Sequence, residues 1–124
     1  MKRILYADTT QKIRIKVKSE DFYLDTDRIT AVSLIVNELI QNCYDHGFED
    51  RESGNIAIEI SGDETTKKIL VVDDGIGFKD LESVNSSLGL SIVNSYVKDK
   101  LRGTLDITSN EHGTRVEITF PMKF

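Results

Sequence analysis

The sequence predicts an α+β two-layer sandwich, in which a mixed, largely antiparallel sheet is covered on one face by two long helices. Several short segments alternate apolar and polar residues or are wholly apolar, as strands do. Two longer segments repeat apolar residues at the helical period of about 3.6. No repeat or low-complexity stretch interrupts the pattern, so residues 1–124 are expected to form a single domain with a core from about 13 to 121.

The first strand is predicted at residues 13–17, where apolar residues alternate with Arg14 and Lys16. The Phe-Tyr-Leu segment at residues 22–24 follows a short polar stretch. It is expected to be a partner strand that closes an opening hairpin.

The first long helix is predicted at residues 27–46, with an N-cap among residues 25–27 and with Gly47 just beyond its end. One broad apolar arc of this helix faces the core, and Cys43 on that arc is expected to be a small core residue.

Glu38, Asn42 and Asp45 lie at helical spacing on a stripe beside the apolar arc, which places them at the rim of the core. A carboxamide oxygen there can bind Mg²⁺, and a carboxylate can orient a nucleophile or accept its proton. An ordinary amphipathic helix with polar residues at this rim is the alternative interpretation.

The middle of the chain contains two predicted strands. Residues 56–60 alternate, and a turn at residues 62–66 leads to the continuously apolar segment 69–72, which is expected to be a central strand buried on both faces. Residues 79–87 are polar, with room for one helical turn.

The second long helix is predicted at residues 88–100, with a cap at Ser86 or Ser87. Residues 104–108 and 114–120 both alternate and form a predicted hairpin across residues 110–113. Pro121 is expected to end the last strand.

Composition restricts the class of protein. Sixteen basic and 21 acidic residues give a net charge of −5, which argues against nucleic acid as a partner. The single cysteine fits a reducing compartment, and no apolar run is long enough to span a bilayer. We therefore expect a soluble, cytoplasmic domain without membrane contact.

The segment Asp73-x-Gly75-x-Gly77 after the apolar strand allows two interpretations. It can be a simple turn. Alternatively, the carboxylate accepts a hydrogen bond from an amino group such as that of adenine, and the glycines let the backbone approach the ligand. The start of the second helix is similarly ambiguous, because free N–H groups there can bind phosphate or only caps and water.

The order of these signals is more specific than any one of them. Along the chain occur Glu38-x-x-x-Asn42 on a helix, Asp73-x-Gly75-x-Gly77, Ser87-Leu88-Gly89-Leu90 opening a helix, and Gly113-Thr114 entering the last strand. This series resembles the GHKL (Bergerat-fold) ATPase superfamily over nearly the whole chain. Within it, the sequence is most similar to the catalytic, ATP-binding domain of two-component sensor histidine kinases.

The resemblance implies an adenine pocket. Asp73 would accept a hydrogen bond from the adenine amino group, with Thr114 supporting it through a hydroxyl or water contact. Gly75 and Gly77 would give the base room.

The resemblance also implies a phosphate site that holds Mg-ATP. Asn42 would ligate the Mg²⁺, Glu38 would act as base or orient the attacking group, and His46 would line the pocket near the triphosphate. Backbone N–H groups at the start of the second helix would contact the phosphates; they belong to Ser87, Leu88, Gly89 and Leu90.

Some features depart from the family pattern. Asp45 stands where these kinases often carry a basic residue, and the glycine-rich segment is reduced to Asn85-Ser86-Ser87. The lid region is short, so modest nucleotide affinity and fast exchange are expected.

Three functions remain open. The first is transfer of the γ-phosphoryl group to a histidine on a separate dimerisation and phosphoacceptor domain, with a cognate response regulator as an indirect partner. The second is a stand-alone regulator similar to the anti-sigma-factor serine kinases. The third is ATP hydrolysis of the gyrase or chaperone type, against which the short lid argues. The chain would be either a catalytic domain of a longer kinase or a complete small regulator.

Overall fold

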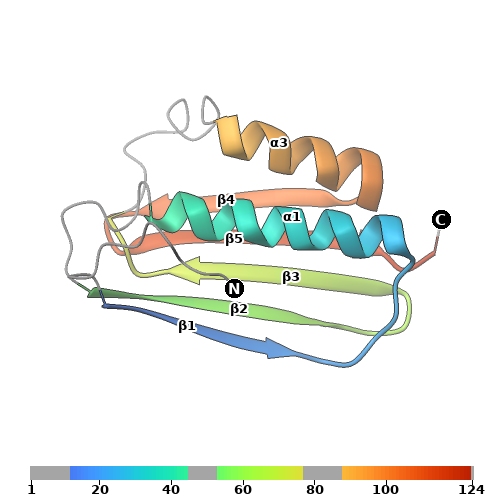
Figure 1. Cartoon of the computed structure of the whole chain (residues 1–124), viewed down its shortest axis with the longest axis horizontal. Helices are drawn as coiled ribbons and strands as arrows, with labels where there is room; N and C mark the ends of the chain where they lie inside the picture. The colour runs from blue at the N-terminus through green and yellow to red at the C-terminus, as the bar shows by residue number, and fades with distance from the viewer. Residues whose placement is uncertain (1–11, 45–52, 77–87, 124) are drawn as a thin grey trace.

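The part of the chain that the structure describes forms two layers, a five-stranded sheet and a pair of helices (Figure 1). The computed structural model describes residues 12–44, 53–76 and 88–123. In chain order the elements are β1 (Lys12–Ser19), α1 (Thr26–Asn42), β2 (Ser53–Gly62), β3 (Thr66–Asp73), α3 (Leu88–Tyr96), a π-helical turn η2 (Val97–Leu101), β4 (Thr104–Asn110) and β5 (Gly113–Pro121). The α+β sandwich predicted from the sequence is thereby confirmed.

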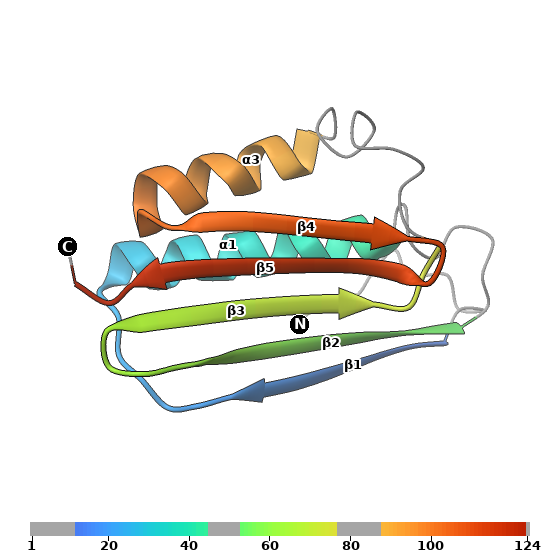
Figure 2. The ribbon, with the colours of Figure 1, turned by 180° about the vertical axis from the view of Figure 1, so that it is seen from behind.

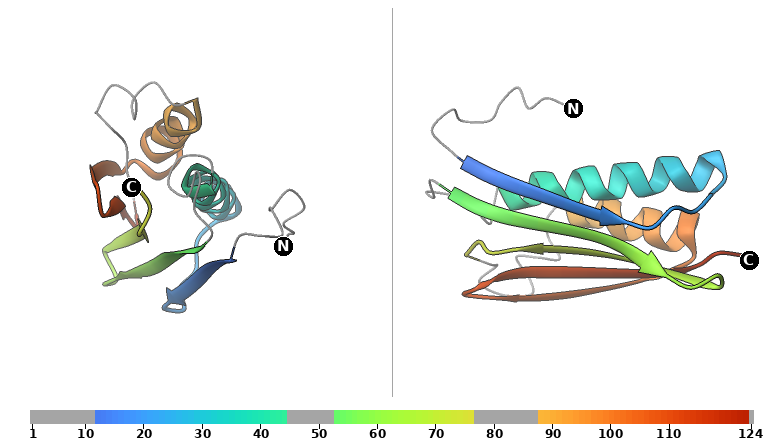
Figure 3. Two further views of the ribbon diagram at one scale, coloured as in Figure 1. Left: turned by 90° about the vertical axis from the view of Figure 1, so that its left-hand side faces the viewer. Right: turned by 90° about the horizontal axis from the view of Figure 1, so that it is seen from below.

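The sheet has the order β1-β2-β3-β5-β4. Only β1 and β2 run parallel, and the other neighbouring pairs are antiparallel, so the sheet is mixed and largely antiparallel. Seen from behind, its open face is not covered by either helix (Figure 2). The end-on view shows both helices on the other face, with β1 at the edge of the sheet (Figure 3).

The prediction of a hairpin between residues 13–17 and 22–24 is wrong. Residues 20–25 are not in a strand, and β1 instead pairs in parallel with β2, with Ile15 opposite Ile56. Parallel neighbours need a crossover, which α1 supplies. Leu24 packs against the core and the Phe22 ring lies 5.0 Å from the Lys67 ammonium, so this segment leads the chain from the sheet into the helix layer.

Helix α1 begins where the capping residues predicted it. The Asp25 side chain accepts a hydrogen bond of 2.9 Å from the backbone N–H of Arg28, which satisfies one of the free donors at the helix start. At the other end Cys43 keeps a right-handed helical backbone. The predicted helix end at His46 and Gly47 lies outside the described residues.

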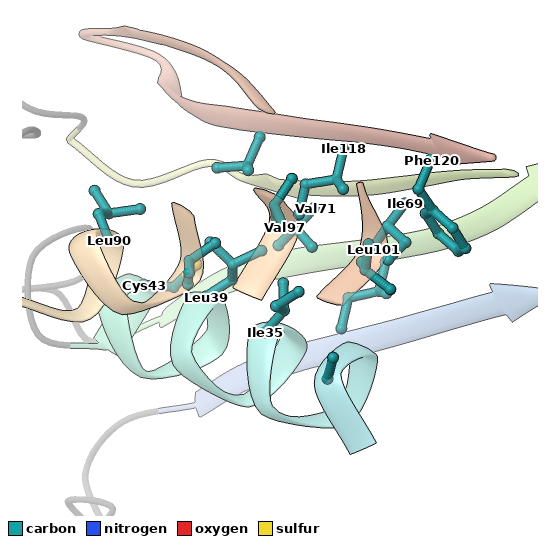
Figure 4. Packing of buried hydrophobic residues seen from close by; sticks show 14 of the residues in the cluster. Ile35, Leu39, Cys43, Ile69, Val71, Leu90, Val97, Leu101, Ile118 and Phe120 are labelled. Carbon is teal, nitrogen blue, oxygen red and sulfur yellow. The ribbon is translucent and has the colours of Figure 1, made fainter. Parts of the chain in front are cut away.

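The core lies between α1, α3, η2 and the inner face of the sheet (Figure 4). Ile35 and Leu39 of α1 and Val97 of η2 meet the inward residues of β3 and β5, including Ile69 and Ile118. The second predicted helix is confirmed as α3, continued by η2 to Leu101. In the described part of the chain, no helix has the length and apolar character needed to cross a membrane.

Strand β3 is central, as predicted, but it is not buried on both faces. Ile69 and Val71 point into the core, whereas Leu70 and Val72 on the open face are half-buried. A continuous apolar run therefore does not require a second covering layer here. The helix layer also leaves much of β1 uncovered, since Val17 is 66% exposed.

We predict that Ile118→Ala lowers the free energy of unfolding by about 2–5 kcal/mol, because it leaves a cavity in a core position that is fully buried. Val17→Ala is the control, since it removes apolar atoms from the exposed edge strand and should change stability by less than about 0.5 kcal/mol. Urea unfolding followed by circular dichroism measures both. Equal losses in the two variants would contradict the described packing.

Candidate functional site

Asp73 is the last residue of β3, and its carboxylate is buried, with 7% exposure. One oxygen, Oδ1, accepts hydrogen bonds from the backbone N–H groups of Gly75 at 2.8 Å and Thr114 at 3.3 Å. The other oxygen, Oδ2, accepts one from the Cys43 thiol at 3.2 Å. These donors come from the turn after β3, from β5 and from the end of α1. Three separate parts of the chain therefore hold one carboxylate.

Cys43 is buried, with 5% exposure, as the apolar arc predicted. Its contact with Asp73 was not predicted. Burial, the charge of Asp73 and the hydrogen bond to Asp73 all raise the pKa of the Cys43 thiol far above its ordinary value. The thiol is thus a protonated donor, and it is not activated as a nucleophile.

Gly113 brings the start of β5 against the end of β3. It has a φ of +137°, and a Cβ placed on it would lie 2.0 Å from the carbonyl oxygen of Asp73. Only glycine combines this backbone conformation with so close an approach. The next residue, Thr114, is buried and can therefore reach Asp73 with its backbone N–H.

The Thr114 hydroxyl does not make the contact expected of it. It lies 2.9 Å from the hydroxyl of Ser109 on β4, and Thr114 contacts Asp73 through its backbone N–H. The structure thus brings Thr114 to Asp73, as the motif order suggested, through its backbone N–H. The predicted role in an adenine pocket stays a prediction.

A second carboxylate fixes the turn after β3. Asp74 accepts hydrogen bonds from the backbone N–H and the side-chain amide of Asn55, both at 2.8 Å, and its own N–H donates to the Asn55 carbonyl at 3.2 Å. The start of β2 is thereby tied to the residue that follows Asp73. The N–H of Gly75, which is buried, completes this turn by its bond to Asp73.

Asn42 and Glu38 lie on α1, one turn apart, and both are half-buried. Asn42 immediately precedes Cys43, which brings the end of α1 to Asp73. Among the described residues, the Asn42 amide nitrogen is buried and has no hydrogen-bond partner. A buried N–H donor without a protein partner is costly unless an acceptor on a ligand completes it. The amide oxygen of the same side chain is a hard donor of the kind that Mg²⁺ takes, so the chemistry of the residue is compatible with the predicted metal ligand.

Helix α3 begins at Leu88, so Leu88, Gly89 and Leu90 form its first turn, where backbone N–H groups lack partners within the helix. The Leu90 side chain is buried in the core (Figure 4). Of the other predicted site residues, His46, Gly77 and Ser87 lie outside the described residues, as does Asp45.

Two grooves open at the same end of the sheet but on its open face. One, of about 350 Å³, includes Arg14, Asn55 and Asp74 in its lining, and the other, of about 230 Å³, includes Thr108 and Arg115. Asp73 borders both, but Asn42 and Glu38 border neither. These grooves are therefore distinct from the helix side of the sheet, where Glu38 and Asn42 lie on α1.

Sequence reasoning missed the contacts that hold Asp73 and Asp74. Cys43 and Asp73 are 30 residues apart, and Asn55 and Asp74 are 19 apart. The Gly113-Thr114 pair was found as part of a motif, but its close approach to Asp73 follows only from the pairing of Asp73 with Thr114 across β3 and β5.

Comparison with known proteins gives a family match over most of the chain. Residues 27–123 match the family described as "Histidine kinase-, DNA gyrase B-, and HSP90-like ATPase". The chain is 32% identical over 120 residues to the sensor histidine kinase PdtaS of Mycobacterium tuberculosis. The matched region covers 94% of this chain but only 24% of that protein. It thus spans about a quarter of the length of that relative.

A smaller relative and a solved structure are also similar. The chain is 28% identical over 120 residues to the anti-sigma F factor of Bacillus velezensis, covering 86% of this chain and 80% of that protein. The histidine kinase domain of the Erythrobacter litoralis EL346 blue-light activated histidine kinase superimposes with a TM-score of 0.81 and 28% identity, over 89% of this chain and 55% of that one.

We predict that the Cys43 thiol makes stability depend on pH above about 9. In the unfolded chain the thiol ionises near its ordinary pKa of 9.0, whereas its raised pKa keeps it protonated in the folded chain. The folded state then binds one more proton. Its contribution is complete below about pH 9, and the free energy of unfolding falls by about 1.4 kcal/mol per pH unit above that value.

Cys43→Ala isolates this effect, because the other ionisable groups are the same in both chains. Urea unfolding from about pH 7 to about pH 10 should show the wild type losing its stability advantage over the variant as pH rises. A difference that stays constant over this range would mean that the thiol ionises equally in both states.

Proposed function

Because the chain belongs to the histidine kinase-, DNA gyrase B- and HSP90-like ATPase family, we propose that it is the ATP-binding catalytic domain of a cytoplasmic sensor histidine kinase. It would transfer the γ-phosphoryl group of ATP to a histidine on a separate phosphoacceptor domain. A response regulator would be an indirect partner, reached through that domain. The observation that carries this proposal is the buried Asp73 carboxylate, held beside the end of the helix that bears Glu38 and Asn42.

Asp73 is suited to recognise the adenine end of ATP. An ionised carboxylate only accepts hydrogen bonds, so it distinguishes an amino group from a carbonyl oxygen. It is also buried, so water competes little for the contact. Gly75 and Asp74 fix the turn that follows, and Gly75 has no side chain to fill the space beside Asp73.

Asn42 and the first turn of α3 are suited to the phosphate end. The Asn42 amide would provide one ligand to a Mg²⁺ ion that neutralises charge on the phosphates when it is bound. The N–H groups from Leu88 to Leu90, which have no partner within the helix, would donate to phosphate oxygens, and the positive end of the helix dipole favours this contact. His46 and Ser87 are proposed to extend this site, and Gly77 the adenine pocket.

Glu38 is the proposed general base or orienting group for the incoming nucleophile. It lies one turn before Asn42 and is half-buried, so it can face the phosphate chain while its stem packs on the helix layer. Phosphoryl transfer asks little covalent chemistry of the protein. Positioning and charge stabilisation supply most of the rate enhancement.

A second candidate is a serine kinase that regulates a sigma factor. The similarity to the anti-sigma F factor supports it, because the chain covers most of that protein's length. Both candidates use the same nucleotide site and differ in the acceptor. Incubation with ATP and Mg²⁺, first with a histidine-bearing phosphoacceptor helix and then with a serine-bearing antagonist protein, separates them by the residue that is labelled.

We predict that Asp73→Asn abolishes ATP binding, because the new amide presents a donor to the adenine amino group and disturbs the three hydrogen bonds that the carboxylate accepts. Isothermal calorimetry measures the affinity, and circular dichroism verifies that the variant is folded. Asp106→Asn is the matched control, since it makes the same change at an exposed position on β4. Undiminished binding by folded Asp73→Asn would refute the adenine role.

We predict that Glu38→Ala retains ATP binding but lowers phosphoryl transfer by about 10²-fold or more, as expected for the loss of a general base. Calorimetry gives the affinity, and transfer of labelled phosphate to the acceptor gives the rate. Leu34→Ala, one turn earlier on the same helix and 41% exposed, is the matched control. Transfer by Glu38→Ala at the wild-type rate would leave Glu38 a structural role only.

A further inference from the structure

The described donors leave Asp73 with one free acceptor position. An ionised carboxylate offers about four lone-pair sites, two on each oxygen. The N–H groups of Gly75 and Thr114 use both sites of Oδ1, and the Cys43 thiol uses one site of Oδ2. Among the described residues, nothing else donates to this oxygen. The remaining site on Oδ2 is therefore the one that a ligand would meet.

The backbone bonds restrain that site only indirectly. Both act on Oδ1, one of them at 3.3 Å, and neither reaches Oδ2. The torsion that rotates an aspartate carboxylate is broad, and rotation about it moves both oxygens together. The Cys43 thiol, 3.2 Å from Oδ2, is the contact that limits this movement, and it comes from α1, across the core from β3.

Cys43 is itself held firmly enough to do this. It is 5% exposed, belongs to the apolar cluster that joins α1 to the sheet, and directly follows Asn42. Figure 4 shows its side chain beside Leu39, among the buried residues of the helix layer. Its position is thus set by the packing of α1 as a whole.

We propose that Cys43 is a positioning residue, which holds Oδ2 of Asp73 so that its free acceptor site faces the amino group of the purine and thereby sets the preference for adenine over 6-oxopurines. This inference rests on the proposed ATP site and adds the residue that tunes its base selectivity. A 6-oxopurine such as hypoxanthine carries a carbonyl in place of the amino group. It would place one acceptor against another, which a well-positioned carboxylate rejects strongly.

The test compares ATP and inosine triphosphate, which differ at that group, on the wild type, Cys43→Ala and Cys43→Ser. Affinities are measured by competition against a fluorescent nucleotide in the presence of Mg²⁺. Cys43→Ala should weaken ATP binding by about threefold to tenfold and leave inosine triphosphate nearly unchanged, because only the amino contact depends on the position of Oδ2. Cys43→Ser keeps a donor and should restore most of the preference.

Ile35→Val is the matched control for packing, since it removes one buried carbon from the same face of α1, two turns from Cys43. It should lower stability without changing the ratio of the two affinities. If Cys43 acted in packing alone, Cys43→Ala would lower the affinities for both nucleotides equally. Cys43→Ser would then not restore the preference for ATP.

The outcomes separate this inference from the function on which it rests. A wild-type chain that does not prefer ATP overturns the proposed function and the role of Cys43 with it. A wild-type preference that Cys43→Ala leaves intact overturns the role of Cys43 alone. A preference that is lost in Cys43→Ala, recovered in Cys43→Ser and kept in Ile35→Val supports it.

Discussion

The arrangement of this domain depends on a buried carboxylate. Burying a charged group is unfavourable unless hydrogen bonds replace its water, and Asp73 obtains them from the turn after β3, from β5 and from α1. Each donor can reach it only if its own element is correctly packed. The carboxylate therefore links the pairing of the central strands to the seating of α1 on the sheet.

The two ends of β3 show how differently the same chemistry can be used. At the far end, the Asp63 side chain accepts hydrogen bonds from the backbone of Thr65 and Thr66 and from the Thr65 hydroxyl, which lowers the pKa of Asp63. That side chain is exposed and only closes the turn. Asp73 at the other end is buried, bound from both layers, and left with one acceptor site. Burial and the source of its donors distinguish Asp73 from Asp63 and support its proposed role in the site.

Local pattern was sufficient to predict most of the fold. Alternation located β2, β4 and β5, the capping residues located the start of α1, and the Gly113-Thr114 pair was correctly placed at the start of the last strand. The predicted pairing of β1 was wrong because residues 22–24 have the composition of a strand. Only the position of α1 shows that these residues must leave the sheet. Cys43 was identified as core, but its bond to Asp73 depends on two elements 30 residues apart.

The proposed site is divided between two layers, and this division would let one domain type serve different acceptors. In that proposal the sheet and the end of α1 would supply the contacts to the base through Asp73 and Cys43, and the helix layer would supply Asn42 and the first turn of α3 for the phosphates. All of these groups would act on the nucleotide. The acceptor would then approach from the phosphate end, beside Glu38, where it need only present a nucleophile. Selectivity for the base and selectivity for the acceptor can thus change independently, since they depend on opposite ends of the same ligand.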